Sequence, residues 1–261
     1  MMSWEKPELE IIRAEWPEGT ASNVKGLFTC RTGGVSSGPY GGPEGILGLN
    51  VGPHVGDAES CVRMNRTIVT QLVPSEPKWL SQVHGATIVR ADDVEGAPEA
   101  DASWTTTPGV VCAVMTADCL PVFLAEKNGR AVAAVHCGWR SLAAGIVQKT
   151  VETLRKEVGG DTAWVAWFGP RIGPEAFETG EDVKAAMLET LPDAERAFAP
   201  QGDGHYLCDL TILAREALAQ AGVTEVVDCG LSTAADANRF WSYRRDGARS
   251  GRHAALVWFE A

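Results

Sequence analysis

The segment CLPVFLAEKNGRAVAAVHCGW places an Asn-Gly pair between two apolar runs. Asn128-Gly129 in this setting is the strongest short-range signal for a β-hairpin with a two-residue type I′ turn. The turn fixes the register, because antiparallel partners sum to a constant index, and Pro121 then comes opposite His136. Residues two apart on a strand share a face, so Cys119 and His136 are predicted to be diagonal neighbours on one face. A three-residue loop would instead put them on opposite faces.

A third residue joins this pair as a candidate metal ligand. His84 ends the run KWLSQV and precedes Gly85, which lets the backbone turn sharply and leaves the imidazole at a strand end. His84, Cys119 and His136 are ligands that zinc accepts, and three of them leave a fourth position open for water or substrate. The alternative is a buried thiol with a satisfied core histidine. The spacing matches no compact zinc-finger pattern.

Charged residues near these ligands are candidates for substrate contacts. Asp118 precedes Cys119, where its carboxylate would either orient a histidine ligand or merely cap a turn. Arg140 follows His136 at the start of a predicted helix, and it would hold an anion together with the helix N-terminal amides unless it is only a solvated or salt-bridged cap. Arg31, which precedes a glycine-rich segment, is a further anion candidate.

A basic cluster interleaved with aromatic residues lies in NRFWSYRRDGARSGRH near the C-terminus. Arginines among aromatics can stack a base and bind phosphate, but they can equally form an interface or a salt-bridged rim. The cluster comprises Arg239, Arg244, Arg245, Arg249 and Arg252, with Phe240, Trp241 and Tyr243.

Net charge limits the partners of this chain. With 34 acidic and 23 basic residues the net charge is -11, which disfavours nonspecific binding of nucleic acid or of an anionic membrane. A phosphate site must therefore be a local basic pocket. The acidic N-terminus lacks the features of a secretory signal, and no run of apolar residues is long enough to span a bilayer, so we expect a cytoplasmic protein. The seven cysteines show no disulfide-framework spacing.

Apolar runs bounded by turn residues predict a mixed α/β protein, because strict alternation of strands and helices fails. We expect one domain over residues 1–261, with mixed sheets under helices. A helical stripe from Leu142 to Val158 stops at Gly159-Gly160, and Asp209 and Gly222 bracket a second helix. The segment 33–56 is expected to be a long ordered loop, the alternative being a mobile insertion. Strands are predicted at 24–30, 78–83, 87–90, 110–116, 120–125, 131–136, 163–168, 224–229 and 254–259.

The motifs SQVHGATIV, TADCLPVFL, AVAAVHCGWRSLAAGI, FGPRIGPEAFE and SYRRDGARSGR together resemble the laccase-domain family, also called the YfiH-type polyphenol oxidase, peptidoglycan editing factor or purine nucleoside phosphorylase family. The resemblance runs from about Gly26 to Val257. It implies zinc bound by the residues that match His84, Cys119 and His136. It also implies a layered α/β/β/α sandwich, related in shape to the catalytic domain of cytotoxic necrotizing factor toxins.

The same resemblance implies phosphorolysis of adenosine, inosine, guanosine and methylthioadenosine, with deamination of adenosine. Phosphorolysis brings phosphate to an oxocarbenium-like ribosyl centre, so Arg31 or Arg140 is expected to hold the phosphate. The sequence departs from the family at Cys137, where relatives usually carry alanine, and this thiol leaves redox behaviour and metal preference open.

Three other functions remain open on the sequence. Cys119 with His136 as base would form a hydrolase or amidase, for example one acting on a cell-wall precursor. Copper in place of zinc would give a polyphenol oxidase, since two histidines and a cysteine also form blue-copper sites. Five histidines are too few for a multicopper relay. The third alternative is a binding module without catalytic activity.

Overall fold

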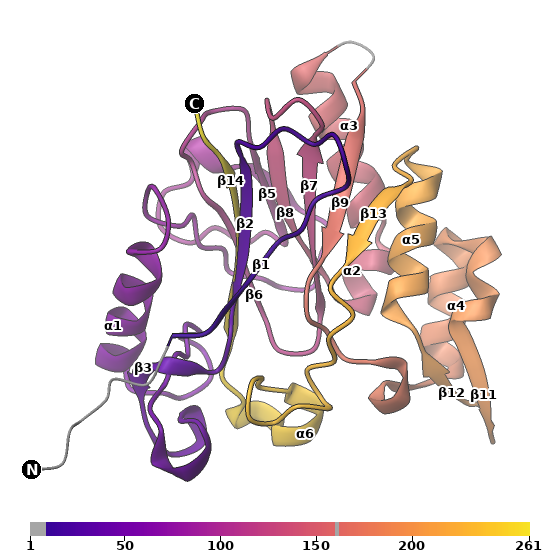
Figure 1. Ribbon diagram of the computed structural model, residues 1–261. Helices are drawn as coiled ribbons and strands as arrows, with labels where there is room; N and C mark the ends of the chain where they lie inside the picture. Colours follow the sequence, from indigo (N-terminus) through magenta and orange to yellow (C-terminus); the bar gives the residue numbers. More distant parts are fainter. Residues whose placement is uncertain (1–8, 160–161) are drawn as a thin grey trace, which may run out of the picture.

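Two β-sheets lie face to face, with helices on the outer side of each, in the computed structural model of residues 9–159 and 162–261 (Figure 1). Gly160, expected at a helix end, lies outside the described residues. The first sheet is antiparallel, in the order β1 (Ile11–Arg13), β2 (Val24–Thr29), β14 (His253–Phe259) and β6 (Cys112–Thr116). The second sheet is mixed, in the order β13 (Glu225–Asp228), β9 (Trp164–Phe168), β7 (Leu120–Glu126), β8 (Val132–Cys137), β5 (Ala102–Thr105) and β4 (Ile88–Arg90).

The remaining elements surround these two sheets. A small antiparallel sheet has the order β10 (Glu178–Gly180), β12 (His205–Cys208) and β11 (Phe198–Gly202), and β3 (Thr32–Ser36) lies apart. The α-helices are α1 (Glu59–Thr70), α2 (Trp139–Ala143), α3 (Ile146–Val158), α4 (Glu181–Thr190), α5 (Leu210–Gln220) and α6 (Tyr243–Asp246). Short 3-10 helices are η1 (Gly38–Tyr40), η2 (Pro43–Gly45), η3 (Ala91–Asp93), η4 (Pro174–Ala176), η5 (Pro192–Ala197) and η6 (Gly247–Arg249).

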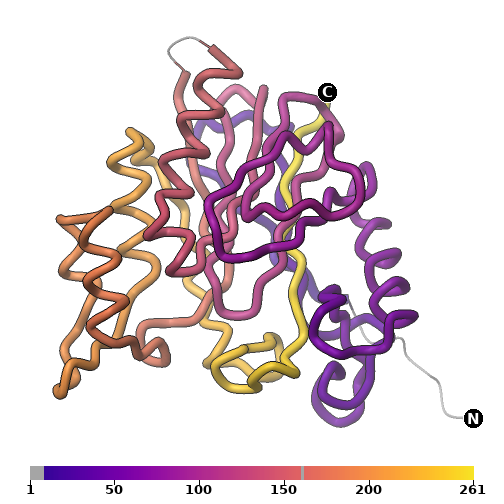
Figure 2. Tube along the Cα trace, turned by 180° about the vertical axis from the view of Figure 1, so that it is seen from behind, coloured from indigo at the N-terminus to yellow at the C-terminus, as the bar shows by residue number. Residues whose placement is uncertain are grey.

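Three apolar clusters define the layers. One lies between the two large sheets, where Phe28 and Phe123 meet. A second packs the outer face of the mixed sheet against α3 and α5, and a third covers the antiparallel sheet next to α1. The predicted α/β/β/α sandwich is confirmed. In both views α1 and α4 lie at opposite ends of the molecule, and the C-terminal segment with α6 lies below the sheets between them (Figures 1 and 2).

The β7–β8 hairpin has the predicted register, with Pro121 opposite His136. The predicted type I′ turn is wrong. Gly129 has a φ of 75°, but Asn128 is not among the residues with positive φ, and the Gly129 amide donates to the Glu126 carbonyl. The buried Glu126 carboxylate accepts hydrogen bonds from Asn128 and Arg130, which fixes a longer loop from Lys127 to Arg130. Like the predicted two-residue loop, this loop contains an even number of residues, so the pairing of the two strands is unchanged.

Two further element predictions need correction. The segment 78–83 makes only isolated bridges, because the side-chain amide of Gln82 bonds both to the backbone N–H and to the carbonyl of Met115 and so takes the place of a strand partner. The predicted helix from Leu142 is divided into α2 and α3 by Gly145, which has a left-handed φ of 74°. The other predicted strands and the helix after Asp209 are present, and the Asp209 carboxylate accepts from two backbone amides of α5.

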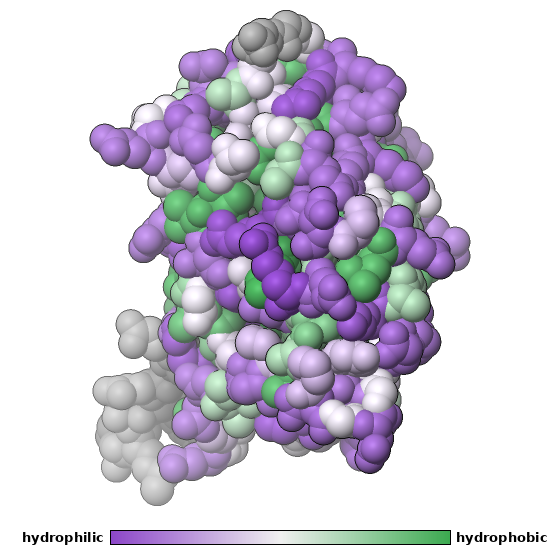
Figure 3. Space-filling view, turned by 90° about the vertical axis from the view of Figure 1, so that its right-hand side faces the viewer, coloured by the Kyte–Doolittle hydropathy of each residue, from purple (hydrophilic) through white to green (hydrophobic). Residues whose placement is uncertain are grey.

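The glycine-rich segment 33–56 folds against the body of the protein as an ordered loop. Leu49 and Val51 are fully buried, as predicted for a loop that needs apolar residues, whereas Ile46 and Leu47 are exposed. Among the described residues, no helix combines the length and apolar character needed to cross a bilayer. The face that carries α4 and α5 shows apolar residues only as separate patches among hydrophilic ones (Figure 3).

The buried histidine of β14 is the basis of a stability prediction. His253 is fully buried and stacks near the Phe28 and Trp241 rings. One of its ring nitrogens lies 2.8 Å from the Thr29 carbonyl oxygen, and the other accepts the Trp241 amide at 3.0 Å. Burial lowers the pKa of His253 to about 3, because the charged form would lose its hydration.

We predict that His253 makes the fold acid-sensitive. The unfolded chain binds a proton at this residue below about pH 6.5, whereas the folded chain does so only near pH 3, so stability is complete above the unfolded value and falls as the pH drops. The slope is about 1.4 kcal/mol per pH unit. His253→Gln should remove that slope in denaturant titrations, while His205→Gln at an exposed position should keep it. Equal slopes in the wild type and His253→Gln would contradict the prediction.

Candidate metal centre

The three predicted ligands come together from three separate parts of the chain. His136 lies on β8, Cys119 lies in the turn that leads from β6 of one sheet to β7 of the other, and His84 lies in the loop before β4. One donor atom from each lies within 4.8 Å of the others. The His84 Nε2 to Cys119 Sγ distance is 3.8 Å, and the two imidazole rings are nearly perpendicular.

The backbone around the ligands is held in uncommon conformations. His84 itself has a φ of 59° and Asp118 a φ of 87°, both in the region that non-glycine residues rarely adopt. The sharp turn expected at Gly85 is therefore made by His84. Gly138 provides room, because a Cβ atom there would lie 2.9 Å from His84 Cδ2 and 3.2 Å from Cys119 Sγ. Any larger residue at this position would push two ligands apart.

One buried carboxylate, that of Asp101, joins two of the ligands. Asp101 Oδ1 lies 2.8 Å from His136 Nδ1, and the two oxygens together accept the backbone N–H groups of Val83, His84 and Gly85. Although burial opposes its ionisation, the hydrogen bond and charge of His136 lower the pKa of Asp101. The sequence gave no local signal for this contact, which arises because β5 pairs with β8 and brings Asp101 beside His136.

The Cys119 thiol and the buried His136 imidazole shift each other's pKa toward the charged forms. Burial would raise the pKa of Cys119, but the charge of His136 and hydrogen bonds from His136 and His84 lower it to about 6. Burial would likewise lower the pKa of His136, but the Cys119 thiolate and Asp101 raise it to about 9. A thiolate is therefore ready at neutral pH, which is the form that binds metal or acts as a nucleophile.

The geometry of these donors fits a zinc ion. Tetrahedral zinc with bonds of about 2.0 to 2.3 Å spaces its ligand atoms about 3.5 Å apart, close to the 3.8 Å between His84 Nε2 and Cys119 Sγ. The contact of His136 Nδ1 with Asp101 leaves Nε2 to face the metal, in the carboxylate–histidine arrangement common around zinc. Three protein ligands leave one position for substrate or water.

Asp118 does not orient either histidine. Its Oδ1 accepts from the Thr233 hydroxyl at 2.6 Å, and its Oδ2 accepts from the Ser242 hydroxyl and the Arg244 amide. The carboxylate therefore ties the Cys119 turn to α6. These partners lie on distant segments, so the carboxylate neither orients a histidine nor caps its own turn, and Asp101 takes the place expected for Asp118 beside a histidine.

A cavity of about 330 Å³ opens beside the three ligands. Its lining combines apolar and aromatic side chains with several cationic ones and with the ligands themselves. The remaining lining residues are His54, Gln82, Met115, Thr116, Ala117, Asp118, Trp139, Arg140, Ile172, Phe177, Leu210, Tyr243, Arg244 and Arg252. This volume and composition are typical of a small-molecule site.

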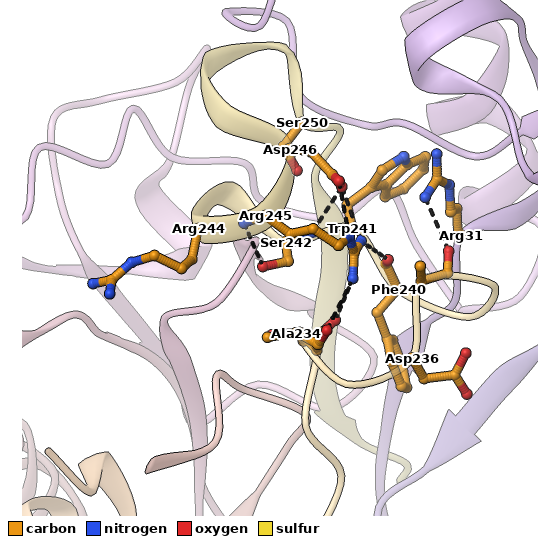
Figure 4. A network of polar contacts seen from close by, with 12 residues as sticks. Arg31, Ala234, Asp236, Phe240, Trp241, Ser242, Arg244, Arg245, Asp246 and Ser250 are labelled. Carbon is orange, nitrogen blue, oxygen red and sulfur yellow. Dashed lines mark hydrogen bonds and ion pairs between the residues drawn. The ribbon is translucent and has the colours of Figure 1, made fainter. Parts of the chain in front are cut away.

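The cavity contains one of the two arginines predicted to hold phosphate. Arg140 is exposed at its edge and stacks on Trp139, with 4.4 Å between the guanidinium carbon and the ring centroid. Arg31 does not line the cavity. Its guanidinium donates to the carbonyl oxygens of Gly41 and Ala237 and lies near Trp241 (Figure 4). Arg31 thus holds the glycine-rich loop against the C-terminal segment.

The C-terminal basic cluster divides into structural and cavity-lining arginines. Arg245 donates to three backbone carbonyls and pairs with Asp246, and Arg239 pairs with Glu10. Phe240 and Trp241 are buried, so they cannot stack a base. Figure 4 shows Arg244 pointing away from this network. Arg244 and Arg252 line the cavity together with Tyr243, and the sequence did not single them out from the rest of the cluster.

Cys137 is not part of the centre. It follows His136 on β8, so its side chain points to the opposite face of the sheet and lies fully buried in the core under α3. Burial raises the pKa of Cys137 well above its usual value. Its thiol is thus kept protonated and on the face of the sheet away from His136, so Cys137 is not a candidate metal ligand.

The fold and the site define a four-layer α/β protein in which a His-Cys-His group lies at the edge of a cavity lined by three arginines. The sequence profile of the family described as multi-copper polyphenol oxidoreductase laccase matches residues 25–260. This chain belongs to that family.

Curated relatives carry a different description. A Pseudomonas aeruginosa protein named purine nucleoside phosphorylase PA4543 is 43% identical over 250 residues, covering 95% of this chain and 98% of that protein. The Escherichia coli purine nucleoside phosphorylase YfiH is 40% identical over 255 residues, with 95% and 98% covered. These names support an enzyme.

Solved structures share the whole fold. The Neisseria meningitidis protein NMB0706 superposes with a TM-score of 0.86 at 42% identity, covering 96% of this chain and 99% of that one. YlmD from Geobacillus stearothermophilus gives 0.85 at 26% identity, with 94% and 96% covered. The α/β/β/α architecture is therefore that of the family.

We predict that Asp101→Asn lowers zinc affinity about 10- to 100-fold, as found for residues that orient metal ligands. The amide matches the carboxylate in size but loses the charge that holds His136 and the amides of the His84 loop. Competition between the protein and a chelator measures the affinity. Asp209→Asn is the matched control, because asparagine also caps a helix and Asp209 lies at the start of α5. Zinc retention by Asp101→Asn equal to that of the wild type would refute the role given to Asp101.

Proposed function

We propose that this chain is a zinc-dependent purine nucleoside phosphorylase that acts on adenosine, inosine, guanosine and methylthioadenosine, and that it also deaminates adenosine. One observation carries the proposal: three metal donors and three arginines line a single cavity in an otherwise acidic protein. The names of the relatives support the reaction class. We also propose that it works in the cytoplasm, where thiols such as Cys119 stay reduced.

The donor set favours zinc over copper. Within residues 9–159 and 162–261, the only group of three or more potential ligands in reach of one ion is His84, Cys119 and His136. A multicopper oxidase passes electrons between several copper ions, which needs more sites than this. When bound, zinc supplies Lewis-acid assistance or a nucleophilic water, as deamination requires.

The cavity walls match the two halves of the reaction. Ile172, Phe177 and Leu210 offer an apolar surface to a purine ring, while the arginines offer donors to an anion. In phosphorolysis an oxygen of phosphate bonds to ribose C1′ as the C1′–N9 bond breaks. The purine leaves with the bonding electrons and takes up a proton, and arginines next to the attacking phosphate would hold it in line.

A second function is favoured by a specific contact. Cys119, His136 and Asp101 stand in the order nucleophile, base and orienting carboxylate, which is the arrangement of cysteine hydrolases. In that case the thiolate would attack an amide carbonyl carbon and form a thioester, while the C–N bond breaks and the amine leaves with a proton from His136. An amidase acting on a cell-wall precursor is the form of this alternative that we consider.

We predict that the protein as purified releases hypoxanthine from inosine only when phosphate is present, and ammonia from adenosine without it. His84→Ala should lose both activities, because His84 completes the metal site but is no part of the Cys119–His136 pair. Removal of zinc by a chelator should have the same effect. Chromatography of the hypoxanthine released from inosine and of the inosine formed from adenosine measures the outcome.

The controls separate the two candidate mechanisms. Cys61→Ala should keep full activity, because Cys61 lies on α1 and outside the cavity. A cysteine hydrolase would instead survive chelation and His84→Ala, and would show an acyl adduct on Cys119 by mass spectrometry. Activity that persists after both treatments would overturn the metal mechanism.

A further inference from the structure

Arg252 differs from the other cavity arginines in its burial, because Arg140 and Arg244 are exposed whereas Arg252 is half-buried. Among the described residues its guanidinium contacts no carboxylate, and only Nη1 is bonded, to the carbonyl oxygens of Ser250 at 2.7 Å and Gly251 at 3.1 Å. Nε and Nη2 have no partner in the described part of the chain. Arg252 is also half-buried, and burial lowers its pKa. Partial burial of a guanidinium that touches no carboxylate is unfavourable, so an anion in contact with its unpaired N–H groups would be stabilising.

The glycine-rich loop holds Arg252 in place from the other side. Asn50 Oδ1 accepts the amides of Gly52 at 2.9 Å and of Arg252 at 2.8 Å, and the Val51 amide donates to the Arg252 carbonyl. Gly52 allows this close approach, because a Cβ atom there would lie 2.6 Å from Arg252 Cγ. Two residues further on, His54 lines the same cavity. Residues 50–54 therefore build a support around the arginine.

Among the described residues, no lining carboxylate contacts the Arg252 guanidinium, although the charges of Cys119 and Asp118 act on it from a distance. Asp118 is the one acidic residue among the lining residues, and both of its oxygens accept hydrogen bonds from Thr233, Ser242 and the Arg244 amide. The Arg244 guanidinium donates to the carbonyls of Ala176 and Glu178. Arg252 is thus the half-buried arginine of the cavity whose Nε and Nη2 groups have no hydrogen-bond partner among the described residues.

We propose that Arg252, with His54, forms the subsite for inorganic phosphate, in place of the sequence-based candidates Arg31 and Arg140. The phosphate oxygens accept from Nε and Nη2 of Arg252, whose planar fork suits a tetrahedral oxyanion. The His54 imidazole N–H donates a further hydrogen bond. This inference rests on the proposed phosphorolysis and specifies where its second substrate binds.

The test is the kinetics of Arg252→Gln with phosphate and inosine varied separately. The loss of charge-assisted hydrogen bonds should raise the KM for phosphate about 10- to 150-fold, while the KM for inosine changes less than about threefold. Arg252→Lys keeps the positive charge but loses the planar guanidinium, so its KM for phosphate should lie between those of the wild type and Arg252→Gln. Arg249→Gln is the matched control, because Arg249 is exposed and outside the cavity. An unchanged KM for phosphate, or an equal rise for both substrates, would overturn the proposal.

A binding measurement keeps this inference separate from the proposed function. Inorganic phosphate without nucleoside should raise the melting temperature of the wild type and not that of Arg252→Gln. If phosphate raises the melting temperature of the wild type but not of Arg252→Gln, and the wild type shows no phosphorolysis, the proposed function is refuted and the phosphate subsite is supported. If it phosphorolyses inosine and the two proteins respond equally to phosphate, the subsite fails. Should Arg252→Gln not fold, His54→Ala at an exposed position decides, and a KM for phosphate equal to wild type refutes the subsite.

Discussion

The buried Asp101 carboxylate is the contact on which the site depends. It receives the His136 ring on one side and three consecutive backbone amides of the His84 loop on the other. These bonds hold His84 in a left-handed conformation that its side chain disfavours. Because a buried carboxylate is stable only with such partners, the loop and the strand are fixed relative to each other. Two candidate metal ligands that are far apart in the sequence are thereby held at a fixed distance by the protein itself.

The sequence predicted what local pairing determines and missed what distant contacts determine. The hairpin register followed from the Asn-Gly signal even though the turn type was wrong, because Glu126 lengthened the loop without changing its parity. Asp101 could not be predicted, since it reaches His136 through pairing between β5 and β8, which no local signal specifies. The hydrogen bonds of the Gln82 side chain to the backbone of Met115, which replace strand pairing, also depend on a distant contact and could not be predicted.

The roles of the arginines also depend on distant contacts that the sequence does not specify. No local sequence signal shows whether Arg31 or Arg252 lines the cavity, and only the folded glycine-rich loop assigns them. The Gly41 carbonyl of this loop accepts a hydrogen bond from the Arg31 guanidinium, whereas the loop bonds only the backbone of Arg252, whose side chain lines the cavity. In a chain of net charge -11, three arginines, Arg140, Arg244 and Arg252, nevertheless line one cavity. The family description and the names of the relatives point to different chemistries, and the site itself, with one three-donor group in the described residues, agrees better with the relatives.

We propose that His84, Cys119 and His136 together bind one zinc ion. X-ray absorption at the zinc edge of protein purified without added metal tests this directly. We expect two nitrogen neighbours at about 2.0 Å, one sulfur at about 2.3 Å and one further light atom. Replacement of Cys119 by serine should remove the sulfur contribution. A spectrum without sulfur in the wild type, or a copper edge of equal stoichiometry in place of zinc, would contradict the account.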